Sequence, residues 1–334
     1  MKAAYYNRQG LAAEVLQIGE LPEVLPGTNE VQIEIHYSGV NPGEVKKRSD
    51  AFGMGMPYPT VIPHSDGAGF IRKVGDGVSE AWMGKKVLCF GAQSYRPFGT
   101  AAAYCCVPVN QVLELSEKVD LAQAAQMGIP GITAHRAIHV GDKGVRRDRA
   151  NQLVLVQGGS GAVGQCAIAI AKMAEARVLA TVRKEADIPI ARSAGADDVY
   201  LSDQNLKQNI LSDHPQGVDH IVEVAFAANI QTNAELLRQG GSIATYASNQ
   251  SPASIPFWPL VFMNVSVFFL GSDDFSLVAK QAAVQDLTEA LSKGWQGLPI
   301  GQVYNLHQIA EAHLHVENKL PGRALIKVKD SLSQ

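Results

Sequence analysis

The sequence has little excess charge of either sign. Its 29 lysines and arginines stand against 32 aspartates and glutamates, which leaves a formal net charge of −3. Proteins that bind nucleic acid through its phosphates usually carry a basic face or a clear excess of cations. Nucleic acid is therefore not expected among the partners of this chain.

Long apolar runs and cysteine pairs are also lacking. The most hydrophobic segment, Val261–Leu270, is about half the length that a membrane-spanning helix needs, and it contains Asn264 and Ser266. The N-terminus, MKAAYYNRQG, has no apolar signal core. The four cysteines form no CxxC pair and no disulfide framework, which favours buried reduced thiols. These absences favour a soluble cytoplasmic protein without a membrane partner.

The composition is that of a protein with a sizeable core and more than one domain. The chain has 334 residues, of which 46% are hydrophobic and 18% are charged. Up to about residue 121, alternating apolar runs such as Glu30–Val40 and Gly84–Phe90 are separated by Pro and Gly clusters. This first part is therefore expected to be a β-barrel-like domain.

A helical connection is expected between the two parts of the chain. The pattern from Asp120 to Val140 predicts a helix, a break at Pro130 and Gly131, and a second helix. The charged segment Gly141–Ala150 is expected to be an exposed loop.

From Gln152 onward, apolar strands alternate with helical patterns, which predicts an α/β domain with a doubly wound parallel sheet of six strands. The expected strands are Leu153–Val156, Arg177–Val182, Asp198–Leu201, His220–Ala225, Ser242–Ala247 and Val265–Leu270. After Ser272 we expect a helix at Ser276–Lys293, a strand at 299–306, a short helix at His307–Asn318 and a last strand from Arg323. These final residues are expected to pack back onto the N-terminal domain.

A glycine-rich turn follows the first of these strands. Gly158, Gly161 and Gly164 are spaced by three residues and lead into the amphipathic helix Ala162–Ala176. The first glycine allows a sharp turn, the second allows backbone N–H groups to approach a pyrophosphate, and the third allows the helix to pack closely on the sheet. The start of the helix presents free N–H groups to the phosphates. The turn therefore predicts dinucleotide binding.

The end of the second strand indicates which dinucleotide is bound. Sites that prefer NAD usually place Asp or Glu there, whereas this chain has Arg183 and Lys184 after Thr181 and Val182. Arginine can pair with a 2′-phosphate through two hydrogen bonds, and lysine can neutralise it. NADPH is therefore the expected cofactor. The alternative is that nearby acids, Glu185 and Asp187, pair with these cations.

Four motifs, taken together, resemble a known family. They are GVNPGE at Gly39–Glu44, PHSDGAG at Pro63–Gly69, GIPGITAHRA at Gly128–Ala137 and GGSGAVG at Gly158–Gly164. In order and spacing they are similar to the zinc-free medium-chain dehydrogenase/reductases, in particular to the NADPH:quinone oxidoreductase and zeta-crystallin branch. The resemblance implies a GroES-like catalytic domain formed by residues 1–122 and 273–334, with a Rossmann NADPH-binding domain at 123–272.

Zinc-dependent members of this superfamily have a ligand Cys where this chain has Asn41, and a ligand His followed by Glu where it has Ser65 and Asp66. A catalytic zinc needs three protein ligands, and Asn and Ser are poor ones. We therefore expect no metal. His64 lies one residue before the ligand position and is interpreted as a partner of a backbone carbonyl or of the nicotinamide ribose.

The resemblance implies roles for further residues. Asn41 is expected beside the reacting end of the nicotinamide, Thr133 near the ribose and carboxamide, and His64 is a further catalytic candidate. Relatives often have a Tyr near the position of Lys46, which can orient or protonate the substrate. Relatives also bind the 2′-phosphate with a Lys and a Tyr where this chain has Asp187 and Ser202. Arg323 either reaches the cofactor phosphates or is an exposed residue before an edge strand. The expected cofactor-binding residues are Gly158, Ser160, Gly161, Ala162, Val163, Gly164, Arg183, Lys184, Ser202, Val224, Ala225, Ala247, Ser248, Leu270, Gly271 and Arg323.

The expected reaction is NADPH-dependent reduction of a quinone or an α,β-unsaturated carbonyl. Phe52, Tyr58 and Tyr95 are candidates to line the substrate pocket, or their neighbourhood is a loop folded onto the core. Two other functions remain open: reduction of 2-enoyl thioesters, and a structural or sensor role that binds NADPH without turnover. The sixth strand, apolar on both faces, is expected at the sheet edge, where it could form a homodimer.

Overall fold

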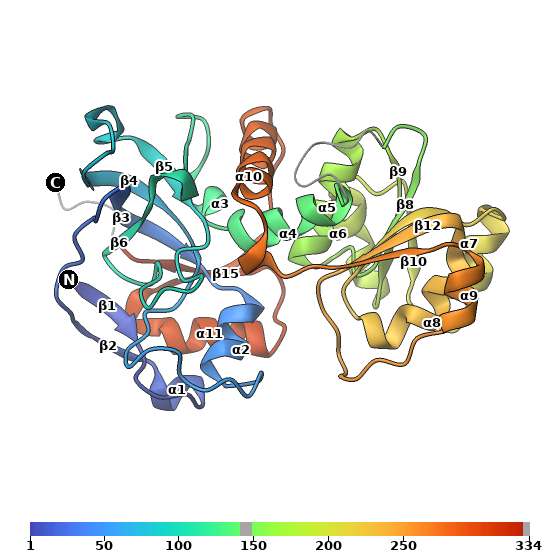
Figure 1. The fold of residues 1–334 in the computed structure, drawn as a ribbon, viewed down its shortest axis with the longest axis horizontal. Helices are drawn as coiled ribbons and strands as arrows, with labels where there is room; N and C mark the ends of the chain where they lie inside the picture. Colours follow the sequence, from blue (N-terminus) through green and yellow to red (C-terminus); the bar gives the residue numbers. More distant parts are fainter. Residues whose placement is uncertain (141–148, 330–334) are drawn as a thin grey trace. The chain divides into compact units, whose positions relative to one another are not determined.

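The computed structural model describes residues 1–140 and 149–329, which fall into two compact units (Figure 1). Unit 1 consists of Met1–Pro130 and Val284–Gln334, and unit 2 consists of Gly131–Ala283. Both divisions lie within helices, namely α4 (Gly128–Ile138) and α10 (Leu277–Ser292). The domain boundaries expected at 122/123 and 272/273 stay predictions.

Unit 1 is built on a seven-stranded sheet in which segments from both ends of the chain lie side by side. The last strand pairs antiparallel with β3 through Leu325 and Gly39, so the expected return of the C-terminal residues to the N-terminal part is confirmed. The main path of the sheet is β14 (Ile300–Asn305), β15 (Arg323–Lys327), β3 (Glu30–Gly39), β4 (Asp66–Val74), β5 (Lys86–Cys89) and β7 (Val112–Glu114), with β6 (Tyr104–Pro108) paired to β3.

Alternation along β3 explains its place in the core of unit 1. Val31, Ile33 and Ile35 are fully buried in one cluster with residues of β4, β5 and β6, as a period of two requires. A two-stranded sheet of β1 (Lys2–Tyr5) and β2 (Gln17–Glu20) completes the strands of this unit. Its helices are α1 (Ala12–Val15), α2 (Pro42–Arg48), α3 (Leu121–Ala124) and α11 (Ile309–Glu317).

The local sequence explains where α2 begins. Asn41 is the N-cap, Pro42 occupies the first helical position, and Asn41 and Glu44 form a reciprocal capping box. Helix α2 lies beside α11, to which it makes contacts in unit 1 (Figure 1). The motif GVNPGE is therefore the start of a helix that directly follows a buried strand.

Unit 2 has the predicted doubly wound sheet, with six parallel strands in the order β10-β9-β8-β11-β12-β13. Three strands have the predicted bounds: β8 (Leu153–Val156), β9 (Arg177–Val182) and β10 (Asp198–Leu201). The others are β11 (Val218–Glu223), β12 (Leu237–Thr245) and β13 (Ser266–Phe269), and the helices are α5 (Ala162–Met173), α6 (Ile188–Ser193), α7 (Leu206–Asp213), α8 (Phe226–Leu236) and α9 (Phe257–Phe262). The fold class is confirmed.

The predicted break at Pro130 and Gly131 is wrong. Helix α4 begins at Gly128 and runs through both residues, and the interruption lies before it, at 125–127. Pro130 is tolerated because the first N–H groups of a helix have no partner within it, so the missing proline N–H costs nothing there. The proline therefore marks the first turn of a helix.

The expected exposed loop at Gly141–Ala150 falls largely on residues 141–148, which lie outside the described residues. At Arg149 the expectation is wrong, because this side chain is buried and donates to the carbonyl of Ile138 from Nε at 3.0 Å and from Nη2 at 2.6 Å.

In the described ranges no helix has the length and apolar character needed to cross a membrane. All four cysteines are buried and none of them forms a disulfide bond, as predicted for the thiols.

Candidate cofactor-binding turn and buried polar site

The glycine turn of unit 2 has the geometry that two of the predicted glycines require. Gly158 has φ of +73°, a conformation that residues with side chains rarely adopt. A Cβ on Gly164 would lie 2.3 Å from the carbonyl oxygen of Gly158. Sequence reasoning missed Gly159, where a Cβ would lie 2.7 Å from the Cβ of Ala180. The adjacent glycine pair was the only sequence signal for this close approach.

The start of α5 is available to an anion. Gly161 is the N-cap and provides no side chain to cap the helix, so the N–H groups of the first turn, including those of Ala162 and Val163, are not bonded by a capping side chain. Such N–H groups, with the positive end of the helix dipole, bind phosphate. The turn and the helix start therefore fit the pyrophosphate of a dinucleotide.

A buried chain of hydrogen bonds supports this turn from below. The N–H of Gly158 donates to Thr181 Oγ1 at 3.2 Å, Thr181 donates to Gln157 Oε1 at 2.7 Å, and Gln157 Nε2 donates to Asn233 Oδ1 at 2.9 Å. Asn233 in turn donates to Glu223. The chain ties the ends of β8, β9 and β11 to one another, and only Thr181 among its side chains was noted from the sequence.

Glu223 is the acidic end of that chain. Its carboxylate accepts hydrogen bonds from the backbone N–H of Ala225 and, at 3.0 Å, from Asn229 Nδ2. Burial raises the pKa of Glu223, while these donors act in the opposite direction. Glu223 therefore holds the segment that contains the predicted cofactor residues Val224 and Ala225.

The other predicted residues at strand ends are brought near this segment. The carbonyl of Ala247 accepts from the N–H of Phe226 at 3.1 Å, and Ser248 Oγ accepts from the N–H of Ala227 at 3.3 Å. Leu270 and Gly271 follow β13, where the N–H of Leu270 donates to Thr245 at 2.9 Å. These residues thus follow the carboxyl ends of three adjacent parallel strands.

The predicted 2′-phosphate residues lie after β9. Arg183 and Lys184 are exposed, and within the described part of the chain neither forms an ion pair with Glu185 or Asp187. The alternative that these acids neutralise the cations is therefore not seen. Ser202 follows β10, and its N–H donates to Val182 at 2.8 Å. Thr133, in α4, is buried.

Unit 1 contains a second polar cluster, centred on Asn41. The Asn41 amide is buried and bonded on both sides: its Nδ2 donates to Asp66 Oδ2 at 2.7 Å and to Glu44 Oε1 at 3.1 Å, and its Oδ1 accepts from Arg323 Nη2 at 2.7 Å. Arg323 is itself buried, and β15 lies between β14 and β3. The interpretation of Arg323 as an exposed residue before an edge strand is therefore wrong.

Asp66 holds one side of this cluster. Both of its carboxylate oxygens accept from the N–H of Ile129 at 2.9 Å. A Cβ on Gly128 would lie 1.9 Å from Asp66 Oδ1, so only glycine permits this approach. Burial and the neighbouring Glu44 carboxyl raise the pKa of Asp66 to about 7, against the effect of its hydrogen bonds and of Arg323. Two buried carboxyl groups thus share one amide.

This cluster does not fit a catalytic zinc ion. The positions of the zinc ligands in related enzymes hold Asn41, whose amide is already bonded, and Ser65, whose N–H donates to Glu44 Oε1 at 3.0 Å. The Arg323 guanidinium, which bonds Asn41 Oδ1, places a positive charge beside the same amide. Over residues 1–140 and 149–329, no group of three or more His, Cys, Asp or Glu side chains could hold a metal ion.

His64 has two side-chain partners. The ring is fully buried, with Nδ1 at 2.8 Å from Ser38 Oγ and Nε2 at 3.1 Å from His313 Nε2. Both ring nitrogens thus face side chains, and the alternative in which His64 bonds a backbone carbonyl is not seen. Sequence reasoning missed His313 and its neighbour Arg48, because nothing in the local pattern indicates a contact over 265 residues.

The structure brings two of the predicted substrate residues together. Tyr58 donates from its hydroxyl to the carbonyl of Tyr95 at 2.6 Å, while the side chain of Tyr95 is 72% exposed. Tyr58 also packs on the buried cluster around Tyr6, which favours a loop folded onto the core. Phe52 is 55% exposed, and the Lys46 ammonium lies 5.8 Å from the centroid of its ring.

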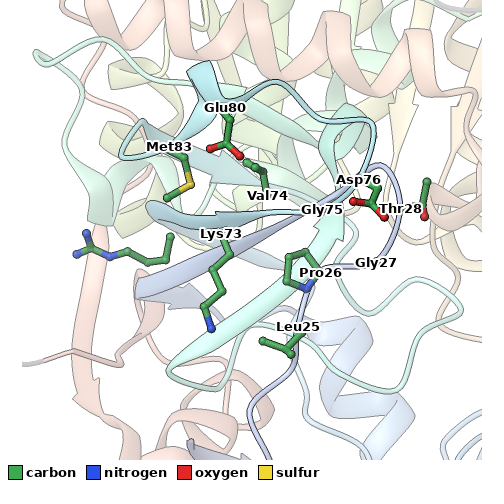
Figure 2. A pocket seen from close by; sticks show the side chains of 11 residues that line it. Leu25, Pro26, Gly27, Thr28, Lys73, Val74, Gly75, Asp76, Glu80 and Met83 are labelled. Atoms are coloured by element: carbon green, nitrogen blue, oxygen red, sulfur yellow. The ribbon is translucent and has the colours of Figure 1, made fainter.

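A surface depression of about 610 Å³ lies elsewhere in unit 1 and is shown in Figure 2. It is lined by residues 25–28, 72–76, 80 and 83, none of which was predicted to act in the site. Its cations are already paired, Arg72 with Glu34 at 2.6 Å and Lys73 with Glu23 at 2.6 Å. The depression therefore offers no free positive charge to an anion.

Comparison with known proteins gives consistent matches over both units. A family model described as alcohol dehydrogenase GroES-like domain matches residues 27–117, and one described as zinc-binding dehydrogenase matches residues 162–288. The quinone oxidoreductase of Rattus norvegicus is 32% identical over 90% of each chain, and that of Homo sapiens is 30% identical over 91% of this chain and 90% of its own. The structure of Escherichia coli quinone oxidoreductase complexed with NADPH superposes with a TM-score of 0.85 at 19% identity, covering 98% of this chain and 100% of the other.

Proposed function

Because the chain belongs to the medium-chain dehydrogenase/reductase family and is an NADPH-dependent oxidoreductase similar to quinone oxidoreductases, we propose that it reduces a quinone or an α,β-unsaturated carbonyl without a metal ion. The assignment of the cofactor site rests on the turn at Gly158, Gly159 and Gly164, where a Cβ on Gly159 or Gly164 would lie less than 3 Å from neighbouring atoms. That turn leaves backbone N–H groups open to a pyrophosphate.

The residues of unit 2 are assigned to NADPH binding. The turn and the start of α5 hold the pyrophosphate, and Arg183 and Lys184 bind the 2′-phosphate. Their exposure and their lack of acidic partners among the described residues support this assignment. The remaining cofactor residues are Thr133, Ser202 and the strand-end residues after β11, β12 and β13. When bound, NADPH supplies the hydride.

The residues of unit 1 are assigned to the reacting end. Asn41 is the proposed nicotinamide-side residue, and its amide is oriented by Asp66 and Arg323 from opposite sides. Proton supply to a reduced quinone does not require a side-chain acid, because solvent can provide it. Tyr95, whose side chain is exposed, is the proposed substrate contact, and Tyr58 holds its backbone through a hydrogen bond to the Tyr95 carbonyl.

Metal independence is supported by the donor set around Asn41. A bonded amide and a serine stand where zinc would need an anionic or imidazole ligand, and a buried arginine lies beside that amide. Metal analysis of the purified full-length protein, followed by chelation, tests this point. A stoichiometric zinc ion whose removal abolishes turnover would overturn it.

A homodimer through the sixth strand of unit 2 is also proposed. Strand β13 is at the edge of the sheet, and Phe269 on it is 73% exposed. Nearby in sequence, α9 exposes Phe257, Trp258 and Phe262. Light scattering at micromolar concentration tests the assembly, and a monomer there would contradict it.

Steady-state assays test the reaction itself. NADPH oxidation is measured with 1,4-benzoquinone, with a simple enone and with an enoyl-CoA as the acceptor. The proposal expects turnover with the first two. Turnover with the thioester alone would favour the enoyl reductase, and tight NADPH binding without turnover of any acceptor would favour a non-catalytic protein.

A further inference from the structure

A continuous chain of buried hydrogen bonds in unit 1 connects a cation to the backbone of the Asn41 cluster. It begins at Arg48, in α2, and ends at the carbonyl oxygen of Asp66, in β4. Four side chains lie between these ends, in the order His313, His64, Ser38 and Thr100. All four, and Arg48, are at most 1% exposed.

The first half of the chain consists of one guanidinium and two stacked imidazoles. Arg48 Nε donates to His313 Nδ1 at 3.3 Å, and His313 Nε2 lies 3.1 Å from His64 Nε2. The two rings are stacked, with centroids 5.2 Å apart and planes inclined by 23°. Arg48 is held by further bonds to the carbonyl of Gly10 and to the carboxylate of Glu317.

The second half consists of two hydroxyl groups. Ser38 Oγ lies 2.8 Å from His64 Nδ1 and 2.7 Å from Thr100 Oγ1. Thr100 Oγ1 lies 2.8 Å from the carbonyl oxygen of Asp66 and donates to it. The side chain of the same Asp66 accepts from Asn41, so the chain terminates on a residue of the candidate site.

The two ends of the chain determine the direction of every hydrogen bond in it. A guanidinium can only donate, and a backbone carbonyl can only accept. His313 must therefore accept at Nδ1 and carry its proton on Nε2, so that His64 accepts at Nε2 and carries its proton on Nδ1. His64 then donates to Ser38, Ser38 to Thr100, and Thr100 to Asp66.

Both imidazoles are neutral in this arrangement, as the alternation of donors and acceptors requires. Burial lowers the pKa of His64 to about 3, with a further lowering by the charge of Arg323. Burial also lowers the pKa of His313 well below its usual range, with contributions from His64 and Arg48. The pair therefore stays deprotonated through the neutral pH range and keeps one tautomer each.

We propose that Arg48 is a positioning residue for the Asn41–Asp66 pair: it sets the tautomers of His313 and His64 and so maintains the hydrogen bond from Thr100 to the Asp66 carbonyl. The kinetic part of this inference rests on the proposed function, whereas the tautomers do not. Residues that orient the contacts of a site through a second layer of hydrogen bonds commonly change its activity by a factor of about 10 to 100.

The tautomers are measured by ¹⁵N NMR of the full chain labelled at histidine, with the signals of His64 and His313 identified by their absence from His64→Asn and His313→Asn. We expect the Nδ1–H form for His64 and the Nε2–H form for His313. Arg48→Met should produce mixed tautomers at both rings, and Arg48→Lys, which keeps a donor, should restore them in part. The opposite tautomers in the wild type, or unchanged tautomers in Arg48→Met, would overturn the proposal.

Kinetics complete the test. Arg48→Met should lower kcat by about 10-fold or more and leave the KM for NADPH within about twofold, since the residues proposed to bind the phosphates of NADPH lie in unit 2. Arg72→Met, the same substitution at an exposed ion-paired arginine, is the matched control and should leave both parameters unchanged. Altered tautomers with an unchanged kcat would refute the positioning role.

A second variant covers the case in which Arg48→Met does not fold. Ser38→Ala removes one small hydroxyl and cuts the chain below His64, so it should lower kcat while His313 keeps its Nε2–H form. Loss of the His313 tautomer in Ser38→Ala would contradict the stated direction. Absence of wild-type turnover with every acceptor would refute the proposed function instead, and the tautomers would still decide the role of Arg48.

Discussion

Arg323 donates a hydrogen bond from Nη2 to the amide oxygen of Asn41 at 2.7 Å, over a separation of 282 residues. The bond joins the last strand of the chain to the start of α2. It also places a buried positive charge beside the carboxyl groups of Asp66 and Glu44, both of which contact the Asn41 amide. The cation thus provides charge compensation in a buried cluster of two carboxyl groups and one amide.

Arg323→Met should therefore destabilise unit 1. The substitution removes the donor to Asn41 and leaves the buried carboxyl groups without their compensating cation, a change that typically costs about 3 to 5 kcal/mol. The free energy of unfolding in urea measures the effect. Arg323→Lys, which keeps the charge, should lose less, and equal losses in both variants would show that charge compensation is not the cause.

Substitutions at two glycines of the turn should weaken cofactor binding. Gly164→Ala places a Cβ 2.3 Å from the Gly158 carbonyl oxygen, and Gly158→Ala forces a side chain to φ of +73°. Both should weaken NADPH binding by about 10-fold or more, because the N–H groups of the turn are displaced. Gly27→Ala, outside the turn, is the control, since its Cβ would lie no closer than 3.5 Å to the nearest side-chain atom, Glu30 Oε2.

Fluorescence titration with NADPH provides the dissociation constants. Gly27→Ala should bind NADPH as the wild type does. If Gly27→Ala weakened binding as much as Gly164→Ala, the loss would not be specific to the turn, and the assignment of the turn would need another basis.

Charge reversal after β9 should discriminate between the two nicotinamide cofactors. Arg183→Glu introduces an acid where a 2′-phosphate is proposed to bind, so the KM for NADPH should rise about 10-fold or more while that for NADH changes little. Arg177→Glu, at the other end of the same strand, is the control, because Arg177 pairs with Asp198 at 3.0 Å. Equal effects of Arg183→Glu on both cofactors would refute the assignment.

Local patterns predicted unit 2 well. The bounds of β8 and β9 and the positive φ at Gly158 follow from short apolar runs and from glycine spacing, which depend on neighbouring residues only. Pro130 was misread because a proline within an apolar helical pattern indicates a break equally well as a first turn. Where α4 begins relative to Pro130 depends on the N–H of Ile129, which donates to Asp66 in another part of the chain.

The residues that sequence reasoning missed are those whose partners are distant in the chain. Arg48 bonds His313, and Gln157 bonds Asn233, but neither pair has a periodic or motif signal. Buried polar side chains of this kind are identifiable only when the fold brings their donors and acceptors together. Asn41 was identified because the resemblance implies a zinc-ligating Cys at its position. Its hydrogen-bond partners, in contrast, could not be derived from the sequence.

The pH dependence of stability should be opposite for Asp66 and His64. The pKa of Asp66 rises from 3.8 to about 7 on folding, so the native state binds more protons than the unfolded state between these values. Its contribution to the free energy of unfolding is fully present below the unfolded pKa and is lost as the pH rises through about 7. The pKa of His64 falls from 6.5 to about 3, so its contribution is present above 6.5 and is lost as the pH decreases.

Urea unfolding from about pH 6 to about pH 8.5 isolates the effect of Asp66, because His64 is neutral in both states over most of that range. The wild type should lose stability as the pH rises. Asp66→Asn should be less stable at pH 6, since its amide NH2 group would face the N–H of Ile129 where a carboxylate oxygen now accepts from it, yet it should lose less as the pH rises. Asp76→Asn, at an exposed position, should keep the wild-type slope. If the Asp66 and Asp76 variants had the same slope, the carboxyl group of Asp66 would be ionised in the folded protein throughout, and the buried cluster would hold two full negative charges against Arg323.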